Sequence, residues 1–132
     1  MLLNRGANGG LAGEDVLVLE KTSRKVDISG INNHSINGLD VVTAAGVVKT
    51  HLGPCIAILH QYAYLGKGRS IHSSGQMEHF KNKVDDRSKL VGGKQSIITA
   101  DGYFIPLQIQ NGLAYMKMRP PLTKNWMSYH MC

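Results

Sequence analysis

The acidic and histidine side chains are the first residues of this sequence that could do chemistry. Asp85 and Asp86 are adjacent carboxyls, and such a pair can share a proton when both groups face the same way. Adjacent side chains on a strand point to opposite faces, and in a turn both would be solvated, so the pair predicts no acid–base dyad. The six histidines occur without a Cys-x-x-Cys or His-Glu-x-x-His pattern. We therefore expect neither a metal ion nor another cofactor.

A second group of candidates is the cluster of hydroxyl and imidazole side chains at Ser70, His72, Ser73 and Ser74. A serine nucleophile with a nearby base is one interpretation, but no Gly-x-Ser-x-Gly elbow is present. A helix cap at Ser73 or Ser74 is the simpler explanation. Glycines also flank lysines at 64–70 and 91–96, but neither stretch has the spacing of a phosphate-binding loop, so both predict turns with a solvated lysine.

The composition predicts one small, turn-rich domain. The chain has 132 residues, 15 of them glycine, with 18% charged and 6% aromatic residues, which favours a β protein over a helical bundle. The formal net charge of +6 comes from scattered lysines and arginines, which is typical of a mildly basic surface.

The cysteines and apolar runs bear on the cellular compartment. Cys55 and Cys132 are the only cysteines, so we expect no disulfide framework and a reducing environment. The N-terminus lacks a basic-then-apolar leader, and the longest apolar run, near 54–59, is too short to span a membrane. We therefore expect an intracellular, cytoplasmic protein without membrane contact.

Short runs of β-forming residues, separated by turn residues, must position any site. Strands are predicted for 15–20, 25–30, 39–50 and 53–66, with the last one buried on both faces and a turn or loop at 30–38. Hairpins are predicted where Asp101-Gly102 interrupts 95–109 and where an Asn-Gly pair begins 110–118. The fold class is therefore all-β (mainly β), a small closed barrel or sandwich.

One short helix is predicted over residues 72–84. Serines that could cap it come first, and Met77, Phe80 and Val84 follow at helical spacing. Gly75 weakens this helix, so it should be no longer than two or three turns.

The opening stretch LLNRGANGGLAG, residues 2–13, carries a resemblance to a known family. Asn4, Arg5, Gly6 and Ala7 stand where retropepsin-like aspartic proteases have Asp-Ser/Thr-Gly-Ala in the active-site loop. The segment SIHSSGQMEHF at 70–80 is similar to the Leu-Leu-Ser-x-x-Gln-Leu segment of copia-type retrotransposon polyproteins. Residues 97–118 resemble the hairpins that close the same region, and GPCIAILHQYAYLGKGRSIHSSGQM looks like versions from diatoms and related algae.

This resemblance implies a fold, a site and partners. It implies a retropepsin-like β domain over 1–118 with a truncated N-terminal strand, a flap from about 29–46, and an exit segment over 119–132 toward the lost remainder of the polyprotein. In the family, two subunits each supply one aspartate, and the two carboxylates share a proton while they act as base and acid on the peptide bond. A homodimer that holds a peptide or polyprotein segment in its cleft is thus expected.

The active-site positions depart from the family pattern. Asn4 has the shape of aspartate but no titratable proton, and Arg5 would place two like charges at the dimer axis. We therefore expect an aspartic endopeptidase-like domain for polyprotein processing that has lost catalysis. Two alternatives stay open, a non-enzymatic β-barrel that binds peptide or nucleic acid, and a gene fragment without function. Nucleic acid is the less favoured ligand because no strand interleaves aromatic with basic residues.

Overall fold

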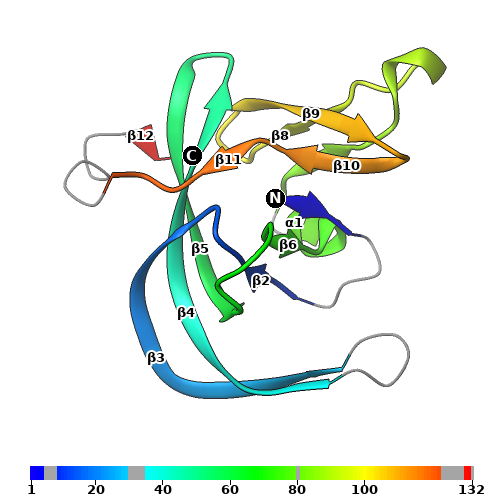
Figure 1. Ribbon diagram of the computed structural model, residues 1–132. Helices are drawn as coiled ribbons and strands as arrows, with labels where there is room; N and C mark the ends of the chain where they lie inside the picture. The colour runs from blue at the N-terminus through cyan, green and yellow to red at the C-terminus, as the bar shows by residue number, and fades with distance from the viewer. Residues whose placement is uncertain (5–8, 30–34, 80, 123–129, 132) are drawn as a thin grey trace.

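The computed structural model describes residues 1–4, 9–29, 35–79, 81–122 and 130–131, and it confirms the all-β class with one short α-helix (Figure 1). The elements, in chain order, are β1 (Leu2–Leu3), β2 (Leu11–Ala12), β3 (Leu17–Ser29), β4 (Ser35–Thr50), β5 (Gly53–Tyr64), β6 (Ile71–His72), α1 (Ser74–His79), β7 (Lys83–Asp85), the 3₁₀ helix η2 (Lys89–Val91), β8 (Ser96–Ile98), β9 (Phe104–Gln110), β10 (Leu113–Met116), β11 (Met118–Arg119) and β12 (His130–Met131).

The strands form one curled sheet that bends around the centre of the molecule as a half-barrel (Figure 1). Its order is β11-β4-β5-β2-β6-β1-β10-β9-β8-β7, with β3 added on β4 and β12 on β5. The short strands β1, β2 and β6 meet in the middle of this order, where β1 runs parallel to β6 and antiparallel to β10. Three segments far apart in the sequence are thereby brought together at the centre of the sheet.

A long hairpin, which we call the arm, extends from this body and consists of β3 with residues 35–45 of β4 (Figure 1). The separate strands expected at 15–20 and 25–30 are one continuous strand, whose pairing with β4 shifts register three times. Residues 35–38, expected in a loop, belong to β4, and the rest of that predicted loop, 30–34, lies outside the described residues. β-Bulges account for this continuity, because each one accommodates an extra residue in one strand and the pairing resumes beyond it.

The core lies beneath the second half of β4 and along β5. Val42, Val48 and Ile56 are completely buried, as expected for strands rich in β-branched residues. Burial of each such side chain contributes about 1.5–3 kcal/mol. The prediction that the whole of 53–66 is buried on both faces is wrong at His60 and Gln61, which are exposed where the backbone of Gln61 has a φ of 59°.

The hairpin predictions are confirmed. Asn111 and Gly112 form a two-residue turn between β9 and β10, with φ angles of 51° and 78°. Both central residues of a type I′ turn need such positive values, which explains the Asn-Gly pair. β8 and β9 also pair as expected, across a connection in which the Thr99 N–H donates to the Tyr103 carbonyl at 2.9 Å.

The helix is shorter than predicted. It covers Ser74–His79, and Val84 lies on β7, where it pairs with Ile97 of β8. The expected cap is Ser73, whose Oγ accepts a hydrogen bond from the Gln76 N–H at 3.3 Å. Phe80, the remaining residue of the predicted apolar face, lies outside the described residues.

Two further observations concern the cysteines and the C-terminal segment. Cys55 is disulfide-bonded, which does not fit the reducing environment expected from the two cysteines. Within the segment 119–132, β12 pairs in parallel with β5, placing His130 opposite Cys55. No helix in the described part of the chain is both long and apolar enough to cross a membrane.

Candidate functional site

Asn4 follows β1, and backbone pairing with β6 at the centre of the sheet fixes its position. Its backbone N–H donates to the carbonyl of His72 at 2.9 Å, which continues the parallel pairing of β1 with β6. The side chain of Asn4 is exposed. The other residues of the predicted active-site loop, Arg5, Gly6 and Ala7, lie outside the described residues.

Asn4 lines a cavity of about 650 Å³, which we call the cleft. One wall is the segment of Asn4 and β2, the opposite wall is β3 of the arm, and the base comes from β4, β5 and β6. The lining residues are Asn4, Gly9, Gly10, Leu11, Arg24, Val26, Asp27, Ile28, Ser29, Val41, Gln61, Ala63 and Ile71.

The polar groups of the cleft do not form an acid pair. Asp27 is the only carboxyl among the lining residues, and its Oδ1 already accepts a hydrogen bond from the Gly38 N–H at 2.8 Å. Arg24 donates from Nη1 to Oε1 of Gln61 at 3.3 Å, which links β3 to β5 across β4. Asn4 contributes a carboxamide, which cannot serve as a general acid or a general base near neutral pH.

The arm presents an unpaired strand edge to this cleft. Residues 26–29 all line it, and consecutive side chains on a strand point to opposite faces. All four residues border the cavity because the register shift between Val26 and Ile28 interrupts the strict alternation there. Within the described residues β3 pairs with β4 alone, so the backbone groups on its other edge have no strand partner.

A second cavity, of about 710 Å³, adjoins the cleft, and we call it the aromatic pocket. It shares Gly9, Gly10 and Gln61 with the cleft. Its lining residues are Gly9, Gly10, Ile58, Leu59, His60, Gln61, Tyr62, His72 and Gln76.

Two of the residues that line the aromatic pocket, Tyr62 and His72, have stacked rings. The centroids of Tyr62 and His72 lie 5.1 Å apart at an interplanar angle of 28°. Burial lowers the pKa of His72 to about 4, so this imidazole is neutral at neutral pH. Among the described residues, the hydroxyl of Tyr62 and Nδ1 of His72 are buried without a hydrogen-bond partner.

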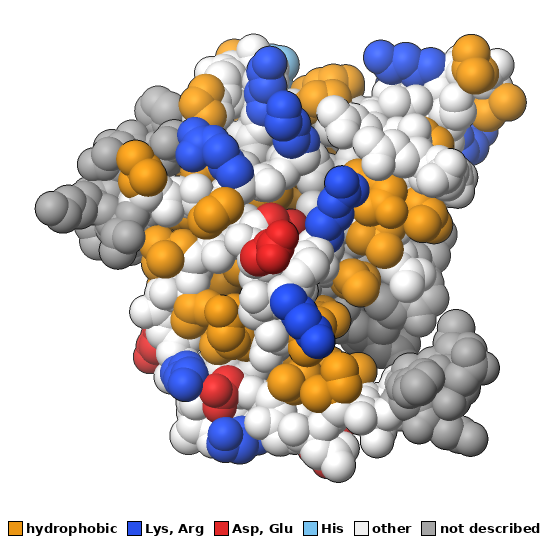
Figure 2. Space-filling view, in the orientation of Figure 1, with side chains coloured by type: hydrophobic (Ala, Val, Ile, Leu, Met, Phe, Trp, Pro, Cys, Tyr) orange, Lys and Arg blue, Asp and Glu red, His pale blue; other side chains and the backbone are white. Residues whose placement is uncertain are grey.

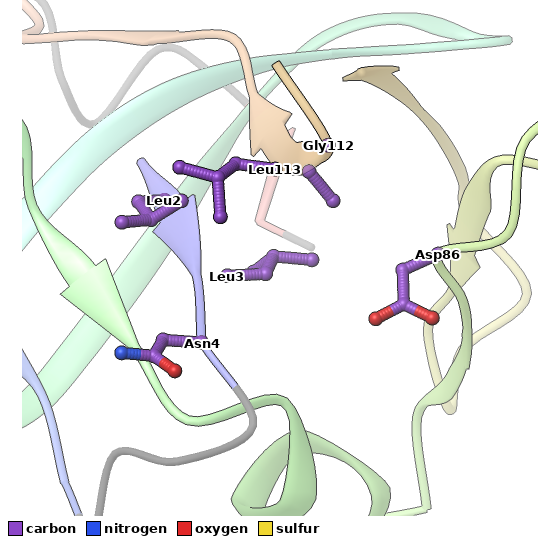
Figure 3. A pocket seen from close by; sticks show the side chains of 7 residues that line it. Leu2, Leu3, Asn4, Asp86, Gly112 and Leu113 are labelled. Carbon is purple, nitrogen blue, oxygen red and sulfur yellow. The ribbon is translucent and has the colours of Figure 1, made fainter. Parts of the chain in front are cut away.

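Asn4 also borders a smaller cavity of about 220 Å³, together with Asp86 (Figure 3). In this view Leu3 lies between the two residues, and the carboxamide of Asn4 is directed away from the carboxylate of Asp86.

The remaining candidates from the sequence have structural roles. Ser70 is buried, and its hydroxyl donates to Asp15 and accepts from the Gly13 N–H at 2.9 Å. The backbone N–H of Lys94 is the main cause of a lowered pKa at Asp85, and the N–H of Arg87 adds to it. No three His, Cys, Asp or Glu side chains in the described ranges are arranged to hold a metal ion.

Sequence reasoning missed Arg24 and Tyr62, which the fold brings to these sites, and Asp15, which hydrogen-bonds Ser70. Asp15 was visible only as the start of a predicted strand, and Tyr62 only as part of an apolar run. Arg24 belonged to a dispersed set of basic residues, and Figure 2 shows such side chains at several places on one face, separated by uncharged ones. The alternation of β3 was the one signal that could have placed Arg24 beside Val26 on a cleft wall.

Comparisons with known proteins add no relative to this description. The chain matches no family model, no curated protein and no solved structure. The resemblance to retropepsin-like proteases therefore rests on the sequence motifs.

Proposed function

We propose that this chain is a retroelement-derived, aspartic protease-like domain that binds an extended peptide or polyprotein segment in the cleft and does not cleave it. The observation that carries the proposal is the position of Asn4, which lines a cavity of about 650 Å³ opposite the open edge of β3. One residue of the motif, Asn4, thus borders a cavity lined by strands, and this supports the proposal.

The edge of β3 supports an extended peptide as the ligand. Unpaired N–H and C=O groups on a strand edge can pair with an incoming strand, which gives affinity for the backbone of almost any sequence. The run of lining residues at 26–29 of β3 spans about 13 Å at roughly 3.3 Å per residue, enough for a peptide of about four residues. Ser29, which borders the cleft, lies at the start of the segment 29–46 expected to act as a flap, whereas Val41 of the same segment is buried in β4 and pairs with Ala63 of β5.

The carboxamide of Asn4 supports binding without hydrolysis. Hydrolysis of a peptide bond needs one group that removes a proton from water and another that protonates the leaving amine. The carboxamide side chain of asparagine does neither. In a homodimer of the kind implied by the resemblance, the second copy would contribute another asparagine and no acid. Arg5 would add two like charges at the same axis, which is costly where they are partly buried.

Cleavage and binding assays with a matched pair of proteins test this function. The natural chain is compared with an Asn4→Asp, Arg5→Ser double variant that carries a short N-terminal extension, near pH 5, on polyprotein-like peptides. We expect both proteins to bind peptide and only the double variant to cleave it, with inhibition by pepstatin-type compounds. Asn4→Asp alone should stay inactive because Arg5 remains.

Circular dichroism at the assay pH shows whether each protein is folded. Cleavage by the natural chain would contradict the inactive assignment. Two folded proteins that neither bind nor cleave any peptide would contradict the whole proposal.

A further inference from the structure

Another cavity, of about 430 Å³, lies apart from the cleft, and we call it the basic pocket. It shares no lining residue with the cleft or with the aromatic pocket. Its lining residues are Lys49, Thr50, His51, Phe104, Pro106, Gln108 and Lys117. The lining contains two lysines and no Asp or Glu, so the pocket favours an anion.

The two lysines stand opposite each other on neighbouring segments of the sheet. β11 pairs antiparallel with β4, and Met118 lies opposite Val48. One position further along this register, Lys117 comes opposite Lys49. Residues so placed have Cβ atoms about 4.5–5.5 Å apart, and like charges there destabilise the sheet. Both side chains are exposed and line one cavity, and neither forms an ion pair in the described part of the chain, so an anion between them would remove a repulsion.

His51 adds a further donor, and the backbone of Phe104 fixes its position. Nδ1 of His51 accepts a hydrogen bond from the Phe104 N–H at 3.1 Å, and the backbone N–H of His51 donates to the Phe104 carbonyl at 3.2 Å. An imidazole that accepts at Nδ1 carries its proton on Nε2, which is then a donor. Because His51 is exposed and lines the pocket, it can donate to an anion held by the lysines.

The basic pocket also has apolar surface. Phe104, which is half-buried, and Pro106, which is exposed, line it from β9. Cations that hold a phosphate beside an aromatic ring on which a base stacks are typical of proteins that bind single-stranded nucleic acid. No single strand interleaves aromatic and basic residues, but the fold brings them together from β4, β9 and the segment between β10 and β11.

A second aromatic and basic pair adjoins the basic pocket. Tyr115 of β10 pairs with Gln108, so the two side chains lie on the same face of the sheet. The guanidinium of Arg69 lies over the ring of Tyr115, 4.6 Å from its centroid. Near the top of the face drawn in Figure 2, lysine and arginine side chains lie with no acidic side chain among them. A strand of several nucleotides thus has a second place to bind beside the pocket.

We infer that the basic pocket binds a nucleotide phosphate, of a free nucleotide or of single-stranded nucleic acid. Lys49, Lys117 and His51 hold the phosphate, and the attached base stacks on Phe104. This site is separate from the peptide-binding cleft, because the two cavities have no lining residue in common.

Fluorescence anisotropy with a labelled oligo-dT of about twelve nucleotides, at roughly 50 and 200 mM salt, tests this inference. The natural chain is compared with a Lys49→Gln, Lys117→Gln double variant. We expect the variant to bind about tenfold more weakly at the lower salt concentration. The slope of log affinity against log salt should become shallower by about 1.4, the value for two lost contacts to a single strand.

A matched control is the Lys83→Gln, Lys89→Gln double variant, which removes the same charge from two exposed lysines outside the basic pocket. It should bind within about twofold of the natural chain, because salt screens distant charges. Phe104→Leu keeps an apolar side chain without a ring and should bind the strand about fivefold more weakly. Displacement of the labelled strand by thymidine monophosphate would identify a free nucleotide as sufficient, whereas displacement only by longer strands would identify nucleic acid.

Thermal unfolding followed by circular dichroism shows that each variant is folded. The Lys49→Gln, Lys117→Gln variant should unfold at no lower temperature than the natural chain, because a repulsion has been removed. Equal losses of affinity in the two lysine variants would place binding on the basic surface as a whole and overturn the inference. A folded natural chain that does not bind the strand at the lower salt concentration, or a Phe104→Leu variant that binds it undiminished, would also overturn it.

Discussion

Asn4 illustrates how one atom type decides what a site can do. Its place at the end of β1, between β6 and β10, is fixed by backbone pairing and does not depend on the side chain. A carboxyl there could titrate, whereas the carboxamide cannot. The sequence identified this position through its motif, but the pairing of Tyr62 with His72 could not be predicted, because β5 and β6 meet only through β2.

The buried imidazole of His72 should make stability depend on pH. Its pKa is about 4 in the folded chain and 6.5 as the ordinary value, so between these limits the unfolded chain binds more protons. Stability should therefore be highest above pH 6.5 and fall as pH drops toward 4. Partial exposure of the ring limits the loss to about 1–2 kcal/mol.

Urea unfolding at pH 7 and pH 4.5 measures this effect. His72→Phe keeps a stacked ring without a titrating group, so it should lose less stability than the natural chain over the same interval. An identical pH dependence in both proteins would show that His72 is not responsible.

Ser70 should be important for stability rather than for catalysis. Ser70→Ala removes the acceptor of the Gly13 N–H and a donor to Asp15 in a fully buried place, which should cost about 2 kcal/mol. The exposed Ser35→Ala is the matched control and should change the unfolding free energy by less than about 0.5 kcal/mol. Chemical denaturation compares the two, and similar losses in both variants would contradict the assignment.

Elements whose conformation follows from their own residues could be predicted from the sequence. Elements whose bounds depend on pairing with another strand could not. The Asn111-Gly112 turn follows from the conformations that those two residues tolerate. The helix over 72–84 was predicted too long because Val84 pairs with Ile97 of β8, the strand that follows β7 in the chain. β3 was likewise predicted as two separate strands. The alternation of its residues is interrupted, but pairing with β4 keeps the strand continuous.

Two glycines show how elements pack closely, and they should differ in cost when changed to alanine. A Cβ at Gly13 would collide with the backbone carbonyl of Gly68, whereas a Cβ at Gly46 would meet the side chain of Met118. Backbone cannot move aside without breaking the bonds around it, but a methionine can change rotamer. We expect Gly13→Ala to lose about 3 kcal/mol and Gly46→Ala about 1 kcal/mol.

Thermal or urea unfolding of the two single variants tests this order. A larger loss for Gly46→Ala would mean that Met118 is held as firmly as the backbone of Gly68.

At the scale of the whole molecule, the well-buried body contrasts with β3, the more exposed outer strand of the arm. No side chain of β3 is fully buried, whereas most of β4 from residue 41 onward is. Local opening is easiest where few apolar side chains are buried. We expect amides of β3 to exchange hydrogen faster than those of β5 at 55–59, as measured by mass spectrometry.

The same measurement reports on ligand binding. A peptide that pairs with the edge of β3 should slow exchange in residues 26–29 and leave 55–59 unchanged. Uniform protection of the body and β3 before any peptide is added would contradict this contrast.

The central position of β1 also has a consequence for how fast the chain folds. Leu2 pairs with Ile71 on one side and with Tyr115 on the other, so the middle of the sheet cannot close until both distant segments are present. Such non-local pairing costs the entropy of closing large loops before the pairing interactions form, and this slows folding. During synthesis on the ribosome, the first strand would wait for nearly the last, with its apolar residues exposed to other chains.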